Sequence, residues 1–226
     1  MTGATVVFDF DGTLVRGDCA AAWLRTRLTD SHWRRLAAGL TWPFLRPGFA
    51  WWRSAWLPAS FYTWLATVGR TPESLEEARD DFLQDCARRR EALLIAPAVE
   101  RLQAHLAAGD RVVIVTGAEA GLARGLWRAL GGPDVELIGS TVRPAFGGYI
   151  GVEHTIGPRK LAALARLGIR PPFAAVYTDS ALDLPLLCET ARPVLVRPDR
   201  RSELRVHRRL RTAVETLRFL KRLGDA

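Results

Sequence analysis

Hydrophobic residues in the second half of the chain form short runs that alternate with amphipathic segments, and a similar run begins the chain. The runs are apolar and partly β-branched, which is typical of buried strands. The predicted strands are 5–10, 111–116, 135–142, 173–178 and 193–196. The helices predicted between them are 97–108, 119–130 and 158–167. Strands that alternate with helices predict an α/β fold, in which helices cover both faces of a parallel sheet.

Residues 17–90 follow a different pattern, which has helical periodicity and no alternating strand signal. Helices are predicted at 19–28, 31–40 and 72–90. We therefore expect two domains. Residues 1–16 and 91–226 form the sheet-based core, and residues 17–90 form an inserted helical domain.

Composition and charge agree with a globular protein that handles anionic molecules. The chain has 226 residues, 48% hydrophobic and 25% charged, and its net charge of +8 comes almost entirely from Arg. A basic protein suits nucleic acid, anionic lipid or a phosphorylated metabolite, although an Arg-rich genome also produces such a charge. An odd number of Cys residues and a strand directly at the N-terminus favour a cytoplasmic chain with reduced thiols.

Polar residues that can hold a cation or a phosphate follow three of the predicted strands, and a lysine begins one of the helices. They are Asp9, Asp11, Thr116, Gly117, Asp179, Asp183 and Lys160. Because the carboxyl ends of parallel strands meet at one edge of a sheet, we expect these residues to lie together. Carboxylate oxygens suit Mg²⁺, and no cluster of His and Cys indicates zinc. The group predicts a site for Mg²⁺ and a phosphate.

Asp9 and Asp11 stand one residue apart, directly before Gly12. At an effective dielectric of about 20, two unit charges about 4 Å apart repel by roughly 4 kcal/mol, so such a pair needs a cation or a shared proton. The alternative is an ordinary Asp-Gly turn after a buried strand. The polar residues at the other strand ends favour the site.

These motifs resemble those of the haloacid dehalogenase superfamily of phosphohydrolases. The matching segments are Asp9-Phe10-Asp11-Gly12-Thr13, Val113-Ile114-Val115-Thr116-Gly117, Lys160 and Tyr177-Thr178-Asp179-Ser180-Ala181-Leu182-Asp183. The resemblance implies a three-layer, Rossmann-like core in which the inserted helical domain, residues 17–90, is a cap over the site. It also implies a phosphatase that forms an aspartyl-phosphate.

The resemblance implies roles for the carboxylates. Asp9 would be the nucleophile, and Asp11 would protonate the leaving oxygen and then activate water. Mg²⁺ would be held by Asp9, the backbone carbonyl of Asp11 and Asp179, with Asp183 supporting these ligands. The alternative for Asp183 is a helix N-cap with Pro185 in the first turn, and the residue could serve as both.

The resemblance also implies that Thr116, the Gly117 N–H and Lys160 would bind the phosphate oxygens. The alternative for Lys160 is an ordinary solvated lysine on a helix. Lys160 is one of two lysines in the chain, and a Leu- and Ala-rich helix follows it, which favours the phosphate-binding role.

Within the superfamily, the chain resembles the phosphoserine-phosphatase-like branch and, in that branch, the phosphatidylglycerophosphatase C family. The shared features are Asp18 at the ninth position after the nucleophile, Gly147-Gly148-Tyr149 before Lys160, and Asp183-Leu184-Pro185-Leu186-Leu187. This resemblance implies a lipid phosphate substrate such as phosphatidylglycerol phosphate. Phosphoserine phosphatases usually have Glu where this chain has Asp18, which weakens a phosphoserine assignment.

The predicted cap is rich in Trp and Arg, since seven of the eight Trp residues lie between Trp23 and Trp64. Both residue types are common at the membrane–water interface, and Asp18, Arg46 and Arg53 are candidates for substrate binding. The uncharged segment 54–69 is short for a membrane span, so we expect it to be interfacial or re-entrant. The alternative is a cap core built from Trp.

A last helix is predicted at about 202–223, with an apolar stripe and a basic face. Such a helix can lie on an anionic membrane surface, or it can pack on the core with its basic face in solvent. With the cap, it predicts a peripheral protein on the inner face of the cytoplasmic membrane.

The leading hypothesis is a Mg²⁺-dependent phosphomonoesterase that acts on a lipid phosphate. The alternatives are the same chemistry on a soluble metabolite such as phosphoserine, and a phosphotransferase that uses the same intermediate. A nucleic-acid-binding protein with an idle site is not expected, because no aromatic and basic nucleic-acid motif is present.

Overall fold

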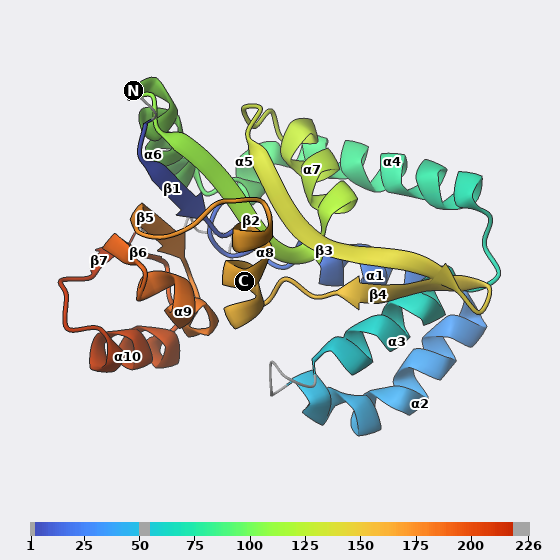
Figure 1. The fold of residues 1–226 in the computed structure, drawn as a ribbon. Helices are drawn as coiled ribbons and strands as arrows, with labels where there is room; N and C mark the ends of the chain where they lie inside the picture. The colour runs from blue at the N-terminus through green and yellow to red at the C-terminus, as the bar shows by residue number, and fades with distance from the viewer. Residues whose placement is uncertain (1–2, 50–54, 219–226) are drawn as a thin grey trace.

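The computed structural model describes residues 3–49 and 55–218, which form an α/β sandwich of three layers (Figure 1). Its sheet has seven strands in the order β4-β3-β2-β1-β5-β6-β7. The strands are β1 Thr5–Phe8, β2 Arg111–Glu119, β3 Glu136–Ala145, β4 Gly148–Glu153, β5 Phe173–Thr178, β6 Thr190–Val196 and β7 Glu215–Leu217. All neighbouring strands are parallel except β3 and β4. The predicted α/β class with a mostly parallel sheet is confirmed.

Helices cover both faces of this sheet. The helices of the described residues are α1 Cys19–Thr29, α2 His32–Phe49, α3 Trp56–Thr67, α4 Pro72–Arg88, α5 Arg90–Leu93, α6 Ala96–Ala107, α7 Ala120–Ala129, α8 Pro158–Arg166, the 3₁₀ turn η1 Ala181–Asp183, α9 Leu184–Leu187 and α10 Arg200–Arg209. Helices α1, α4, α6 and α7 contribute buried side chains to one hydrophobic cluster, and α8, α9 and α10 contribute to another.

Strand β1 lies at the centre of the sheet and joins the two clusters. Val6 and Phe8 belong to the first cluster, whereas Val7 between them belongs to the second. Successive side chains of a strand point to opposite faces, so a strand between two helical layers is apolar at every position. The site therefore starts from a strand that is buried on both faces.

The inserted region, residues 17–90, contributes to the main core as well as to a helical group outside it. Trp23 of α1 and Phe82 of α4 are buried, and their rings meet edge to face at 5.6 Å. Helices α2 and α3 instead lie beside the far end of the β3–β4 hairpin (Figure 1). The division into a core and a cap stays a prediction.

Helix α2 is longer than the predicted segment 31–40, since it continues through Pro43 and Pro47 to Phe49. Proline lacks an N–H and usually ends or kinks a helix, which is why the sequence pattern favoured an earlier end. Within this helix, the Thr41 hydroxyl donates to the Ala37 carbonyl at 2.8 Å.

The prediction of one helix over 202–223 is wrong for its described part. Helix α10 ends at Arg209, and Glu215–Leu217 is the edge strand β7, parallel to β6. Val214 and Leu217 pack into different hydrophobic clusters, so they form no single helical stripe. Glu215 holds the edge strand through ion pairs with Arg101 and Arg192, which the local pattern could not indicate.

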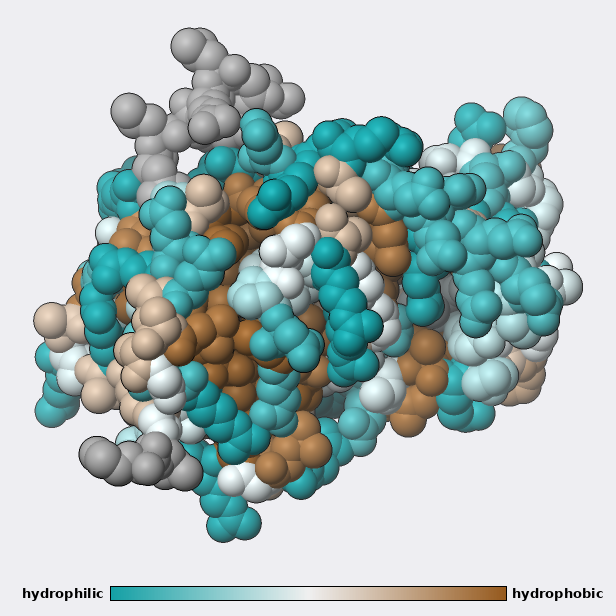
Figure 2. Space-filling model, turned by 90° about the horizontal axis from the view of Figure 1, so that it is seen from above, coloured by the Kyte–Doolittle hydropathy of each residue, from teal (hydrophilic) through white to brown (hydrophobic). Residues whose placement is uncertain are grey.

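The surface that carries α4, α6 and α7 is mainly hydrophilic around its rim, with apolar side chains showing in its left-central part (Figure 2). Exposed large apolar side chains gather elsewhere, on α2 and the start of α3. Within residues 3–49 and 55–218, no helix is both long and apolar enough to cross a membrane.

If α4 is part of the main core, replacing Phe82 with Ala should lower the free energy of unfolding by about 3 kcal/mol, because a large buried ring is lost. The matched control is Phe44→Ala on α2, where the side chain is 82% exposed and the expected change is below about 0.5 kcal/mol. Urea denaturation measures both, and equal effects would contradict the packing of α4.

Candidate active site

The loop after β1 is a tight turn that fixes Asp9 and Asp11. The Asp9 N–H donates to the Tyr177 carbonyl of β5 at 2.9 Å, and the N–H groups of Leu14 and Val15 both donate to the Phe10 carbonyl. Phe10 and Leu14 are fully buried and anchor the turn in the core. The two carboxylates are therefore held by main chain that is itself held by apolar packing.

Gly12 brings Asp179 against this loop. Gly12 has a φ of +76°, and a methyl carbon added there would lie 2.2 Å from the Asp179 Oδ2 atom. No side chain fits in that space, so glycine is needed both for the left-handed backbone and for the close approach. The carboxylate that follows β5 thus lies directly on the loop that follows β1.

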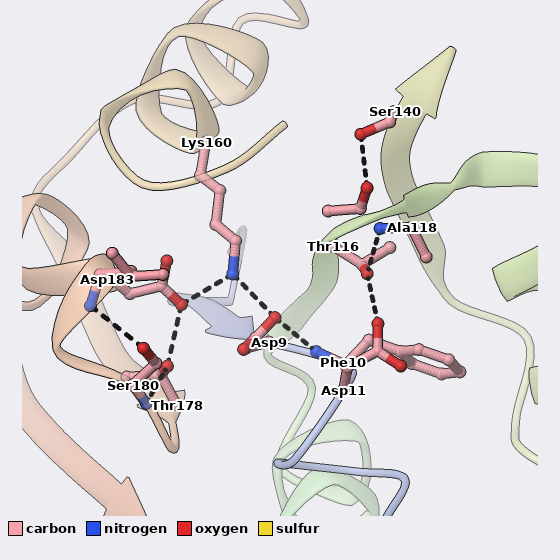
Figure 3. A network of polar contacts seen from close by, with 12 residues as sticks. Asp9, Phe10, Asp11, Thr116, Ala118, Ser140, Lys160, Thr178, Ser180 and Asp183 are labelled. Carbon is pink, nitrogen blue, oxygen red and sulfur yellow. Dashed lines mark hydrogen bonds and ion pairs between the residues drawn. The ribbon is translucent and has the colours of Figure 1, made fainter. Parts of the chain in front are cut away.

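Lys160 joins two of the carboxylates. Its side chain enters from the first turn of α8 and is buried, and its Nζ atom lies 2.7 Å from Asp9 Oδ1 and 2.7 Å from Asp183 Oδ2 (Figure 3). The Thr178 hydroxyl donates to the same Asp183 oxygen at 2.8 Å. Helix α8, strand β5 and the turn η1 therefore converge on Asp9.

Asp11 lies on a second branch of the network (Figure 3). Thr116, which follows the regularly paired part of β2, donates to Asp11 Oδ2 at 3.2 Å. The N–H of Cys19, the first residue of α1, donates to Asp11 Oδ1 at 2.8 Å. The start of the inserted helical region is thus tied directly to this carboxylate.

The carboxylates are buried, and the single ammonium group of Lys160 does not neutralise all of their negative charge. Burial raises the pKa of Asp9 even though Lys160 opposes the shift, and Asp183 and Asp179 raise it further. Burial also raises the pKa of Asp11, and it raises the pKa of Asp179 to about 6. For Lys160, burial favours a lower pKa, but the charges of Asp183 and Asp9 outweigh it, so the ammonium form is stabilised.

Gly117 is held in place by contacts with Ser140 of β3 and with the 155–156 segment. Its carbonyl accepts a hydrogen bond from the Ser140 hydroxyl at 2.6 Å, and Ser140 in turn accepts from the Thr155 N–H. A methyl carbon at Gly117 would lie 2.9 Å from the Ile156 side chain. Glycine therefore allows the 155–156 segment to pack closely against the end of β2.

The predicted residues of the core come together, whereas those assigned to the cap do not form one group. Asp18 is the N-cap of α1 and accepts from the Ala21 N–H at 2.8 Å, although its charge still raises the pKa of Asp11. Arg46 is exposed on α2, and Arg53 lies outside the described residues. The Asp183 side chain makes no N-cap bond to α9, because it binds Lys160 and Thr178.

Three contributors to the site were not singled out from the sequence. Thr178 orients Asp183, Ser140 supports Gly117, and the Cys19 N–H binds Asp11. Thr178 stands beside Asp179 in a quoted motif and could have been found from its place at the strand end. A backbone N–H that binds through tertiary contact leaves no sequence signal.

The residues proposed as metal ligands form an oxygen-only donor set. Within the described ranges 3–49 and 55–218, no three side chains of His, Cys, Asp or Glu converge as a ready metal site. The predicted metal ligands include only two side chains, the carboxylates of Asp9 and Asp179, and the third ligand is the backbone carbonyl of Asp11. Oxygen donors and uncompensated negative charge fit a hard divalent cation such as Mg²⁺.

A cavity of about 330 Å³ adjoins the site at Gly117. Its wall combines α1, α3 and α4 with the ends of β2, β3 and β4, and none of the four aspartates of the network lines it. Its size is that of a small-molecule pocket. The structure therefore has a buried cluster of carboxylates and, beside Gly117, a cavity of small-molecule size.

Solved structures share this fold. A protein with unknown function from Bordetella pertussis Tohama I is 23% identical, with 96% of this chain and 99% of that chain covered and a TM-score of 0.75. A probable phosphoserine phosphatase from Vibrio cholerae is 16% identical, with 96% and 60% covered and a TM-score of 0.59. A phospho-aspartyl intermediate analogue of phosphoserine phosphatase is 14% identical, with 91% of each chain covered and a TM-score of 0.57.

At these identities the likeness shows the fold, and the family comes from the sequence motifs. The family model of haloacid dehalogenase-like hydrolases matches residues 6–188, which include β1, the Thr116 strand, Lys160 and the Asp179–Asp183 segment. The superfamily resemblance is therefore confirmed, and the chain belongs to the haloacid dehalogenase-like hydrolases.

Proposed function

We propose that the chain hydrolyses phosphomonoesters through an aspartyl-phosphate on Asp9. The observation that carries this proposal is the geometry of Asp9. Within the described residues, its carboxylate accepts from the Phe10 N–H and from Lys160, both through Oδ1. Oδ2 is then the oxygen that attacks phosphorus, while Lys160 lies where it can hold a phosphate oxygen.

Asp11 supplies the proton transfers. Burial raises its pKa, so it can carry a proton that passes to the ester oxygen as the phosphorus–oxygen bond breaks. The resulting carboxylate then takes a proton from the water that attacks the aspartyl-phosphate, which releases phosphate and restores Asp9. Thr116 and Gly117 at the end of β2 would hold the other phosphate oxygens.

Mg²⁺ is the cofactor that fits this site. Burial raises the pKa values of Asp9, Asp11 and Asp179, and the charges of neighbouring carboxylates raise them further. When bound, Mg²⁺ would neutralise the repulsion between the anionic nucleophile and the anionic phosphate. Asp9, Asp179 and the Asp11 carbonyl would hold it, with Asp183 supporting them.

Replacing Asp9 with Asn should lower kcat for p-nitrophenyl phosphate by about 10⁴-fold or more, because an amide is not a nucleophile at phosphorus. The control is Asp80→Asn, an exposed residue of α4, which should keep full activity. Phosphate release measured with Mg²⁺ decides the result, and retained activity in the Asp9 variant would refute the proposed nucleophile.

The metal-free protein should lose stability as pH rises from about 4 to about 6. Since the Asp179 pKa rises from 3.8 to about 6 on folding, the folded state binds more protons in this interval, and the free energy of unfolding falls with pH. The expected loss from this group is about 2–3 kcal/mol.

Urea unfolding with a chelator at several pH values measures this dependence. The Asp179→Asn variant removes the titrating group, so its stability should fall less over the same interval. Added Mg²⁺ should stabilise the native protein more near the upper end of the interval. Parallel curves for the two proteins would show that Asp179 titrates as it does in the unfolded chain.

We further propose that the substrate is a lipid phosphate, such as phosphatidylglycerol phosphate, presented at an anionic membrane surface. Four exposed apolar side chains on α2 support this. They are Trp33, Leu36, Leu40 and Phe44, between 51% and 82% exposed. Their spacing places them on one face of the helix, where they can enter the headgroup region of a bilayer.

Basic side chains supplement this apolar face. Exposed arginines of α10 line a groove with Leu184 and Leu204. Helices α2 and α10 both lie along the lower edge of the molecule in Figure 1. Arginine near an anionic leaflet contributes about 1 kcal/mol of attraction each. Peripheral binding at the inner face of the cytoplasmic membrane is the location that this surface supports.

A soluble phosphomonoester such as phosphoserine is the second candidate. It is supported by the cavity, which has the size of a small metabolite, and by the shared fold with phosphoserine phosphatases. Trp23 is buried, but in the main hydrophobic cluster with α4, so the alternative of a cap core built from Trp stays a prediction. Transfer of the phosphate to another alcohol would use the same intermediate.

Replacing both Leu36 and Leu40 with Asp should reduce flotation with vesicles of phosphatidylglycerol by about tenfold, since both exposed leucines would leave the bilayer interface. The control is Leu167→Asp, which changes a leucine of similar exposure at the end of α8. No flotation of the native protein would reject the membrane surface and favour the soluble substrate.

A further inference from the structure

The cavity beside Gly117 has an apolar wall with one permanent cation in it. Trp23 and Leu24 of α1, Leu75 of α4 and Leu122 of α7 supply much of the apolar surface. Arg79 of α4 also lines it. Among the described lining residues, His154 is the other basic group, and burial lowers its pKa, so it favours the neutral form.

Arg79 is held only loosely by its acidic neighbour. Its Nη2 atom lies 3.6 Å from Glu119 Oε2, which is an ion pair too long for a good hydrogen bond. The Glu119 oxygens are already engaged, because they accept from the N–H groups of Gly121 and Leu122 at 2.7 and 2.8 Å. Glu119 thus serves mainly to cap α7.

The guanidinium of Arg79 therefore keeps donors that no protein group uses. Its Nε atom is buried and has no hydrogen-bond partner within residues 3–49 and 55–218. A buried donor without a partner is unfavourable, and such a group in a pocket points to a ligand that completes it. Guanidinium binds carboxylates and phosphates in a two-pronged geometry, and the Arg79 side chain is 39% exposed, so an anion can reach it from solvent.

We propose that this cavity takes the alcohol part of the substrate and that Arg79 binds a second anionic group on it. The substrate is then a phosphomonoester that carries a carboxylate or a phosphodiester besides the phosphate that is removed. This inference rests on the proposed phosphatase function and narrows its substrate class. Glu76, the remaining acidic group of the wall, is exposed and does not occupy the Arg79 donors.

The test compares two pairs of esters that differ in the second anion. Phosphoserine carries a carboxylate that phosphoethanolamine lacks, and dihexanoyl phosphatidylglycerol phosphate carries a phosphodiester that glycerol 3-phosphate lacks. Arg79→Gln should raise KM about tenfold to a hundredfold for at least one of the two esters that carry the second anion, because a charge-assisted hydrogen bond is lost. The kcat values should stay within about twofold, because Arg79 does not contact the transferred phosphate.

Two further variants separate binding from folding. Arg79→Lys keeps the charge and should recover part of the lost affinity. Arg88→Gln, at a position of the same helix whose side chain is 68% exposed, should leave all four KM values unchanged. Circular dichroism establishes that each variant is folded before its kinetics are compared.

Each outcome decides the proposal. A KM increase confined to phosphoserine assigns the site to a carboxylate, and one confined to the lipid assigns it to a phosphodiester. If Arg79→Gln changes KM equally for both esters of each pair, or changes no KM value, the second-anion site is overturned while the phosphatase function stands. If the native chain hydrolyses p-nitrophenyl phosphate but none of the four esters, the second-anion site fails alone; if it hydrolyses none of the five, the phosphatase function fails as well.

Discussion

The rest of the site depends on the buried ammonium of Lys160, which Asp9 and Asp183 share at 2.7 Å each. These residues are 151 and 23 positions from Lys160 in the chain, so the ion pairs join β1, α8 and the turn after β5. Removing one partner of such a buried pair typically costs about 3–5 kcal/mol, because an uncompensated charge is left in the interior. The network thus sets the position of Asp9 more firmly than hydrophobic packing alone could.

The same burial creates an excess of negative charge. Gly12 lets Asp179 approach the Asp9–Asp11 loop, and the raised pKa values of these carboxylates express their mutual repulsion and loss of water. One ammonium offsets only part of this charge. An acidic site that is preorganised in this way favours a divalent cation together with a phosphate, because the cation screens the carboxylates from the anionic substrate.

Much of the core could be predicted because burial on both faces makes the interiors of strands such as 111–116 and 173–178 apolar. The polar residues after them could be placed on one edge by topology alone. The end of the chain could not be predicted, since residues 210–217 have apolar spacing that also suits a helix, and Glu215 selects the strand through contacts with Arg101 and Arg192. Local periodicity does not contain such long-range partners.

Helix α1 contacts both the Asp11 carboxylate and the cavity beside Gly117. Its first N–H binds Asp11 Oδ1, while Trp23 and Leu24 one turn further on line the cavity beside Gly117. In the proposed reaction, a substrate group that packs on these side chains would contact the helix that holds Asp11, the proposed general acid. Its N-terminal N–H favours the ionised form of Asp11, whereas burial and Asp18 favour the protonated form. At the start of α1, the Cys19 N–H and the Asp18 charge therefore act in opposite directions on the pKa of Asp11.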